Sequence, residues 1–146
     1  MKIVIIGVGN ELKGDDKVGL EVVEKLKNKI KNENFLFIKT LTPENWIWKI
    51  IKLKPKLIVI LDSCDFGGKP GEFRIIKENE IQEFLISTHN LPLTLFLRGI
   101  KQEISPKIIF IGIQPKEFGF GKEMSKEVKE SVKKVVDFVE RLTKNF

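Results

Sequence analysis

Short apolar runs alternate along the chain with longer stretches in which apolar positions follow a helical period. Residues 3–6 and 57–61 are continuously apolar and rich in β-branched side chains, and residues 107–113 form a third, largely apolar run. Runs without a polar face are typical of central strands in a parallel sheet, because both faces of such strands are buried. Residues 35–39 predict a shorter strand. The pattern therefore favours an α/β fold.

The stretches between and after these strands predict helices. They cover residues 16–32, 42–54, 79–85, 92–101 and the chain from residue 125 on. In the last helix the apolar positions recur at steps of three and four residues: Val128, Val132, Val135, Val136, Val139 and Leu142. We expect Ser125 to cap this helix. Asp15 or Asp16 is expected to cap the first helix, whose positive end a carboxylate also favours.

One connection between strands is too short for a parallel crossover. Residues 62–70 form a loop that contains Gly67-Gly68, and residues 72–76 then predict another strand. Parallel neighbours need a crossover of roughly a dozen residues or more, usually with a helix. We therefore predict one antiparallel strand in a five-stranded mixed sheet. The expected architecture is a three-layer α/β/α sandwich of phosphorylase/hydrolase-like type, formed by a single domain over residues 1–146.

Composition indicates the compartment of the protein and argues against some classes of partner. Hydrophobic residues make up 42% of the 146 residues and charged residues 32%, and no apolar run approaches the ~20 residues of a membrane span. The net charge of +6 is carried mostly by scattered lysines with few aromatics among them, unlike a nucleic-acid-binding stripe. A single cysteine fits a reducing compartment. We expect a cytoplasmic monomer that binds no nucleic acid and does not insert into a membrane.

Three polar side chains are candidates for a functional site. Asp16 follows the first strand, Asp62 ends the third strand, and His89 is the only histidine. Open α/β sheets bind ligands at the carboxyl ends of their strands, and carboxylates with an imidazole suit a divalent transition metal. Structural roles are the alternative for each residue: a helix cap for Asp16, a turn for Asp62 and a hydrogen-bonded scaffold for His89.

A dinucleotide site is a poorer interpretation of the first loop. Gly7-x-Gly9 begins the corresponding glycine motif, but Leu12 stands in place of its third glycine. Lys39 ends the second strand, where an NAD site has an acid. Cys64 is not marked as a nucleophile by any neighbouring base, and we expect it to be a small buried residue.

A phosphoacceptor receiver domain is the stronger alternative. Such a domain uses an acid pair after the first strand, an aspartate ending the third strand and a lysine after the fifth. Asp15 and Asp16, Asp62 and Lys116 stand in those places. The antiparallel return after Asp62 argues against this interpretation, because a receiver has a helix at that point.

Four segments spread along nearly the whole chain carry a resemblance to one family. They read GVGNELKGDDKVG, DSCDFGGKPGEFRI, STHNLPLTLF and IGIQPKEFGFGKEMS. Together they resemble the hydrogenase maturation endopeptidases, in the branch that processes the hydrogenase-3 large subunit. The resemblance implies a metal-dependent, nickel-recognising endopeptidase of the aspartic-type maturation class. Such an enzyme removes the C-terminal extension of a [NiFe]-hydrogenase large-subunit precursor after nickel insertion.

The same resemblance implies the site. The family's metal-binding positions fall on Asp16, Asp62 and His89, which are then also the catalytic residues. Nickel is supplied by the precursor, and zinc and cadmium are further ions for the site. One segment departs from the family. Its Asp-Gly-Gly-like stretch after the second strand is replaced here by residues 38–42, IKTLT, so either that acid is dispensable or cleavage is weakened or altered.

Overall fold

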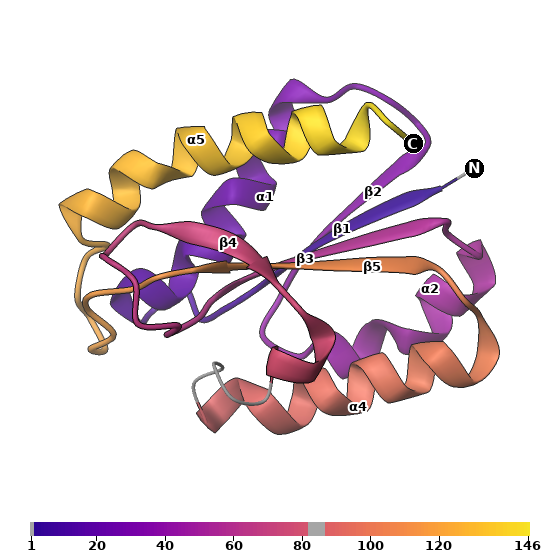
Figure 1. The fold of residues 1–146 in the computed structure, drawn as a ribbon, viewed down its shortest axis with the longest axis horizontal. Helices are drawn as coiled ribbons and strands as arrows, with labels where there is room; N and C mark the ends of the chain where they lie inside the picture. The colour runs from indigo at the N-terminus through magenta and orange to yellow at the C-terminus, as the bar shows by residue number, and fades with distance from the viewer. Residues whose placement is uncertain (1, 82–86) are drawn as a thin grey trace.

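A five-stranded mixed sheet forms the centre of the molecule. The computed structural model describes residues 2–81 and 87–146, and for residues 87–90 it describes the backbone alone. The strand order is β2-β1-β3-β5-β4 (Figure 1). The strands are β1 (Ile3–Val8), β2 (Phe35–Thr40), β3 (Leu57–Ser63), β4 (Phe73–Ile76) and β5 (Lys107–Ile113). β4 pairs antiparallel with β5, and the other three pairings are parallel. The predicted mixed sheet is confirmed.

Helices cover both faces of this sheet. In chain order the structure contains η1 (Gly14–Lys17), α1 (Val18–Lys29), η2 (Pro43–Trp46), α2 (Ile47–Leu53), η3 (Glu78–Glu80), α4 (Ser87–Glu103) and α5 (Lys126–Thr143). Helices α1 and α5 lie on one face, and α2 and α4 lie on the other (Figure 1). This arrangement is the predicted three-layer sandwich.

The two apolar cores explain why the central strands have no polar face. In β3, Leu57, Val59 and Leu61 pack against α1 and α5. Ile58 and Ile60 alternate with them and pack against α2 and α4. Because strand side chains alternate between faces, a strand covered on both sides needs apolar residues at every position.

Two helix boundaries differ from the sequence prediction. The helix expected over residues 16–32 is a 3-10 turn, η1, followed by α1, which ends at Lys29. Helix α4 begins at Ser87, although the sequence predicted a start near Pro92. Proline is favoured in the first turn of a helix, which is why Pro92 suggested a start, but here the preceding residues extend the helix upstream. Of the short helix predicted over residues 79–85, residues 82–85 lie outside the described part.

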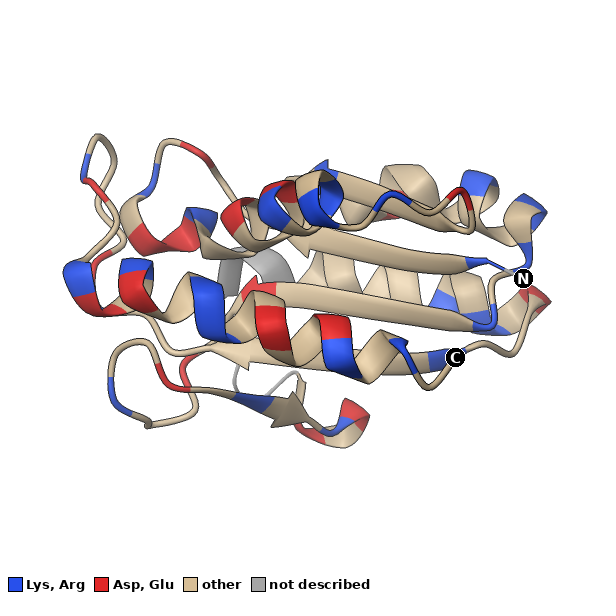
Figure 2. Ribbon diagram, turned by 90° about the horizontal axis from the view of Figure 1, so that it is seen from above, with Lys and Arg blue, Asp and Glu red and all other residues tan. Residues whose placement is uncertain are grey.

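Charges are distributed over the helices without a one-signed stripe. Figure 2 shows lysine and arginine interspersed with aspartate and glutamate along the helices, while the strands are almost free of both. Among the described residues, no helix combines the length and the apolar character that crossing a membrane requires. The helices therefore present mixed-charge outer faces and keep their apolar faces on the sheet.

Candidate functional site

Three connections begin where the parallel strands have their carboxyl ends, at the side of the sheet that we call its carboxyl edge. The β1–η1, β3–β4 and β5–α5 connections all leave from this edge, and α4 begins at the same end of the molecule (Figure 1). β3 lies between β1 and β5 in the sheet, so their ends are neighbours.

Asp16 is held at this edge by hydrogen bonds to both carboxylate oxygens. The Ser63 hydroxyl, at the end of β3, donates to Oδ1 at 2.9 Å. The Asn10 backbone N–H donates to Oδ2 at 3.1 Å. The side chain is only 3% exposed. Donors from the end of β3 and from the β1–η1 connection therefore fix the plane of this carboxylate.

Glycine at position 9 allows that close approach. A Cβ on Gly9 would lie 2.1 Å from the Asp16 carbonyl oxygen, well inside van der Waals contact. Any larger residue would push η1 away from the end of β1. The Gly7-x-Gly9 pattern is thus explained by packing of the chain on itself, and a dinucleotide is not needed to account for it.

Asp62 is the second candidate residue, and it is fully buried near the end of β3. It follows Ile58 and Ile60 in the alternating series that faces α2 and α4. The next residue, Ser63, contacts Asp16. Asp16 and Asp62 are therefore linked through consecutive positions of one strand, and Asp62 belongs to the sheet face that α4 covers.

His89 lies in the first turn of α4 by its backbone. The sequence placed it at a junction between two helices, and the structure puts it inside one. Its side chain lies outside the described part, so the grouping of His89 with Asp16 and Asp62 stays a prediction. Among the side chains that the structure describes, no group of three or more histidines, cysteines or acids is arranged to hold a metal.

The prediction that Asp15 or Asp16 caps the first helix is wrong, because no side chain that the structure describes caps η1 or α1, and Asp15 has another role. Its buried carboxylate accepts hydrogen bonds from the backbone N–H groups of Lys116, Glu117 and Ser125, at 2.7, 2.8 and 2.6 Å. The Ser125 hydroxyl adds a fourth bond of 2.9 Å. Asp15 thus fastens η1 to the β5–α5 connection. Ser125 does precede α5, but its hydroxyl binds Asp15.

The receiver interpretation loses two of its residues in the structure. Asp15 is occupied by the four donors of the β5–α5 connection and is fully buried. The Lys116 ammonium pairs instead with Glu127 at 2.7 Å on the surface. This ion pair raises the pKa of Lys116 and lowers the pKa of Glu127. Lys116 is therefore oriented along α5, away from the role a receiver would give it.

Cys64 behaves as the small buried residue that was expected. Its side chain is inaccessible to solvent. Burial, with a smaller effect of the Asp62 carboxylate, raises the pKa of the Cys64 thiol to about 12. A thiol that stays protonated near neutral pH is a poor nucleophile.

Two polar residues that organise this edge were missed in the sequence. Ser63 holds Asp16, and buried Gln114 holds the β3–β4 loop. The Gln114 side-chain oxygen accepts from the Phe66 and Gly68 N–H groups, each at 3.0 Å, and its amide donates to Asp65 at 3.0 Å. The sequence signal for both residues was their position: Ser63 ends an otherwise apolar strand, and Gln114 directly follows one.

The segment that departs from the family resemblance borders the site. Lys39 pairs with Glu24 of α1 at 2.6 Å, and this hydrogen bond raises the pKa of Lys39. Thr40 and Leu41 line a groove of about 330 Å³ together with Gly9 and Asn10. Residues 38–42 therefore supply an ion pair and a groove wall at the place where an acid was expected.

Comparisons with known proteins agree with this fold and show the family. The model of the family described as hydrogenase maturation protease matches residues 20–142. The hydrogenase 3 maturation protease of Escherichia coli K12 is 37% identical over 141 residues, covering 96% of this chain and 90% of that protein. The crystal structure of a [NiFe] hydrogenase maturation protease from Thermococcus kodakarensis KOD1 superimposes with a TM-score of 0.85 at 35% identity, covering 98% and 92% of the two chains.

Proposed function

The chain belongs to the hydrogenase maturation protease family, and from that premise we propose that it cleaves a [NiFe]-hydrogenase large-subunit precursor. The proposed reaction removes the C-terminal extension of the precursor after nickel has been inserted. The observation that carries this proposal is the buried Asp16 carboxylate, oriented by Ser63 and Asn10 beside the strand end that bears Asp62. Such an arrangement is typical of a carboxylate that meets a ligand in one defined geometry.

In the proposed reaction, nickel arrives as part of the substrate. Asp16, Asp62 and His89 would complete the coordination of an ion that the precursor brings with it. Oxygen ligands with one imidazole suit a divalent transition metal and leave positions for the precursor's own ligands. A precursor without nickel lacks the group that these three residues would recognise, so we expect it not to dock productively.

Hydrolysis then needs a polarised carbonyl or water and a group that accepts a proton. Nickel held by the precursor would supply Lewis-acid polarisation at this place. Asp16 or Asp62 accepts the proton from the attacking water, as carboxylates do in general base catalysis. Asp16 is suited to this task because hydrogen bonds to both of its oxygens hold the carboxylate in one orientation.

The decisive experiment compares nickel-loaded with nickel-free precursor. Each form is incubated with the protein, and loss of the C-terminal extension is followed by mass spectrometry. We expect cleavage of the loaded form alone, and no cleavage by Asp62→Asn. Equal cleavage of both forms would refute nickel recognition. An intact extension in both forms, with wild-type protein, would refute the peptidase activity.

A further inference from the structure

Three exposed apolar side chains stand around Asp16. Leu12, Leu41 and Phe120 are 67%, 48% and 70% exposed. They lie on the connections that follow β1, β2 and β5, at the same edge of the sheet as Asp16. We call these three residues the apolar rim. Large apolar side chains gathered in the open mark surfaces that contact another molecule.

Two positions of the rim are fixed to each other. The Gly121 N–H, next to Phe120, donates to the Leu12 carbonyl at 2.8 Å. The Lys13 ammonium lies 5.1 Å from the centre of the Phe120 ring. The four hydrogen bonds to Asp15 fasten the base of the same connection. Hydrogen bonds therefore hold in place the backbone segments that bear Leu12 and Phe120.

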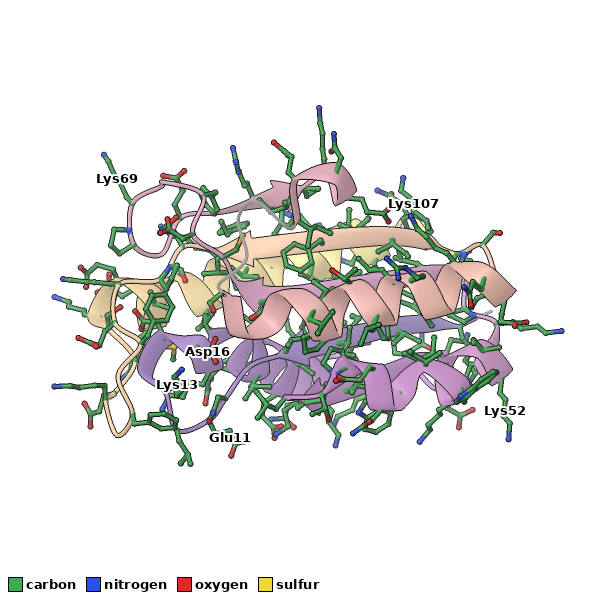
Figure 3. The ribbon with its side chains drawn as sticks, turned by 90° about the horizontal axis from the view of Figure 1, so that it is seen from below. Glu11, Lys13, Asp16, Lys52, Lys69 and Lys107 are labelled. Carbon is green, nitrogen blue, oxygen red and sulfur yellow. The ribbon has the colours of Figure 1, made fainter. Side chains whose placement is uncertain are left out.

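A groove between Leu12 and Leu41 shares one residue, Asn10, with the candidate site. Its volume is about 330 Å³, and Leu20 and Asn10 are among the residues that line it. Asn10 also donates its N–H to Asp16. Figure 3 shows Glu11 and Lys13, which flank Leu12, at the same end of the molecule as Asp16. A molecule that fills this groove therefore contacts Asn10, the residue whose N–H holds the Asp16 carboxylate.

We propose that the apolar rim and its groove bind the precursor segment next to the cleaved bond, through apolar side chains of that segment. The inference rests on the proposed function, because that function identifies the chain that must reach Asp16. The groove and the site share Asn10, so the occupant of one is continuous with the occupant of the other. The leucines of the groove favour apolar side chains, Glu11 and Lys39 add one charge of each sign to its lining, and the metal site selects the nickel.

The test replaces the two exposed leucines of the groove, Leu12 and Leu41, and compares the result with a matched change elsewhere on the surface. Leu12→Ser/Leu41→Ser removes both apolar walls. Ile75→Ser is the control. Ile75 has the same 48% exposure as Leu41, and it lies on β4, the outer strand on the other side of the sheet from β2. Binding of nickel-loaded precursor is measured by interferometry and cleavage by mass spectrometry. Sedimentation velocity records self-association of each protein.

We expect the double variant to raise the dissociation constant and KM for the precursor by about tenfold or more. Its kcat should be unchanged, and Ile75→Ser should match wild type. Equal affinity of the double variant and wild type would overturn the rim proposal, while cleavage by wild type would leave the proposed function standing.

The remaining outcomes are also decisive. If precursor binding depended on the rim but wild type cleaved no precursor, the rim proposal would be supported and the proposed peptidase activity refuted. A wild-type dimer that the double variant dissociates, with precursor affinity unchanged, would assign the rim to a second copy of the chain and overturn the proposal. Absence of any precursor binding by wild type would overturn both proposals.

Discussion

The Ser63 hydroxyl donates a hydrogen bond of 2.9 Å to Asp16 Oδ1, joining the end of β3 to the turn that follows β1. Both side chains are buried, so water does not replace this bond. Ser63 also directly follows Asp62 in β3. One strand end therefore supplies a candidate ligand and the residue that orients another.

Ser63→Ala should lower activity more than stability. It removes a donor that fixes Asp16, and loss of an outer hydrogen-bond partner of a metal ligand typically costs about 10–100-fold in metal affinity or activity. We expect cadmium affinity, measured by calorimetry, and precursor processing both to fall in this range. Ser63→Thr, which keeps a hydroxyl, should restore part of both.

Ser131→Ala is the matched control for Ser63→Ala. Ser131 is also buried, and its hydroxyl donates to the Val128 carbonyl at 2.7 Å within α5. We expect its metal affinity and processing to equal those of wild type. If Ser63→Ala and Ser131→Ala had equal metal affinities and processing rates, Ser63 would have no orienting role.

Asp15→Asn should destabilise the fold and loosen the β5–α5 connection. The amide replaces one acceptor oxygen by a donor group that faces backbone N–H groups. Stranding buried donors costs about 1–3 kcal/mol, which chemical denaturation would measure. Hydrogen exchange should rise at Lys116, Glu117 and Ser125, whose N–H groups Asp15 binds. Asp137→Asn changes a partly exposed carboxylate of α5 that pairs with Lys29 at 3.2 Å, and it should leave exchange at Lys116, Glu117 and Ser125 unchanged. Unchanged exchange in Asp15→Asn would contradict the assigned role.

The adjacent acids Asp15 and Asp16 show what the sequence could reveal. Spacing identified both as residues at the carboxyl edge, and it predicted the sheet correctly because strand periodicity is a local property. It could not separate their roles. The partners of Asp15 lie 101 to 110 residues away along the chain, and such contacts are set by tertiary packing.

Ser63 and α4 illustrate two other limits. Ser63 continues an apolar strand, and only the neighbouring turn reveals what its hydroxyl binds. The start of α4 was misplaced: the sequence predicted it near Pro92, whereas the helix begins at Ser87, so a proline at the start of an apolar period does not by itself mark the first turn. The antiparallel β4 was predictable, since the length of its connection is itself a sequence property.

Cys64 should resist alkylation in the folded protein. Burial raises its pKa to about 12, so the reactive thiolate is scarce at pH 8, where an ordinary cysteine with a pKa of about 8.5 is partly ionised. Iodoacetamide at pH 8 should label unfolded protein in guanidinium and leave folded protein unlabelled. Cys64→Ala should process precursor at the wild-type rate per folded molecule; a large loss in soluble, folded Cys64→Ala would give the thiol a role in the reaction.

His89→Ala tests the metal site most directly, because it removes the only imidazole in the chain. Two carboxylates alone suit hard ions better than nickel. We expect nickel affinity to fall by more than the about 10–100-fold that loss of an outer partner costs, and processing of loaded precursor to stop. The melting temperature should change little, since a ligand to a substrate-borne ion is not required for folding. Calorimetry with nickel, mass spectrometry of the precursor and thermal unfolding measure the three quantities. A His89→Ala protein that binds nickel and trims loaded precursor as wild type does would remove His89 from the site, whereas a lower melting temperature with activity intact per folded molecule would place it in the scaffold.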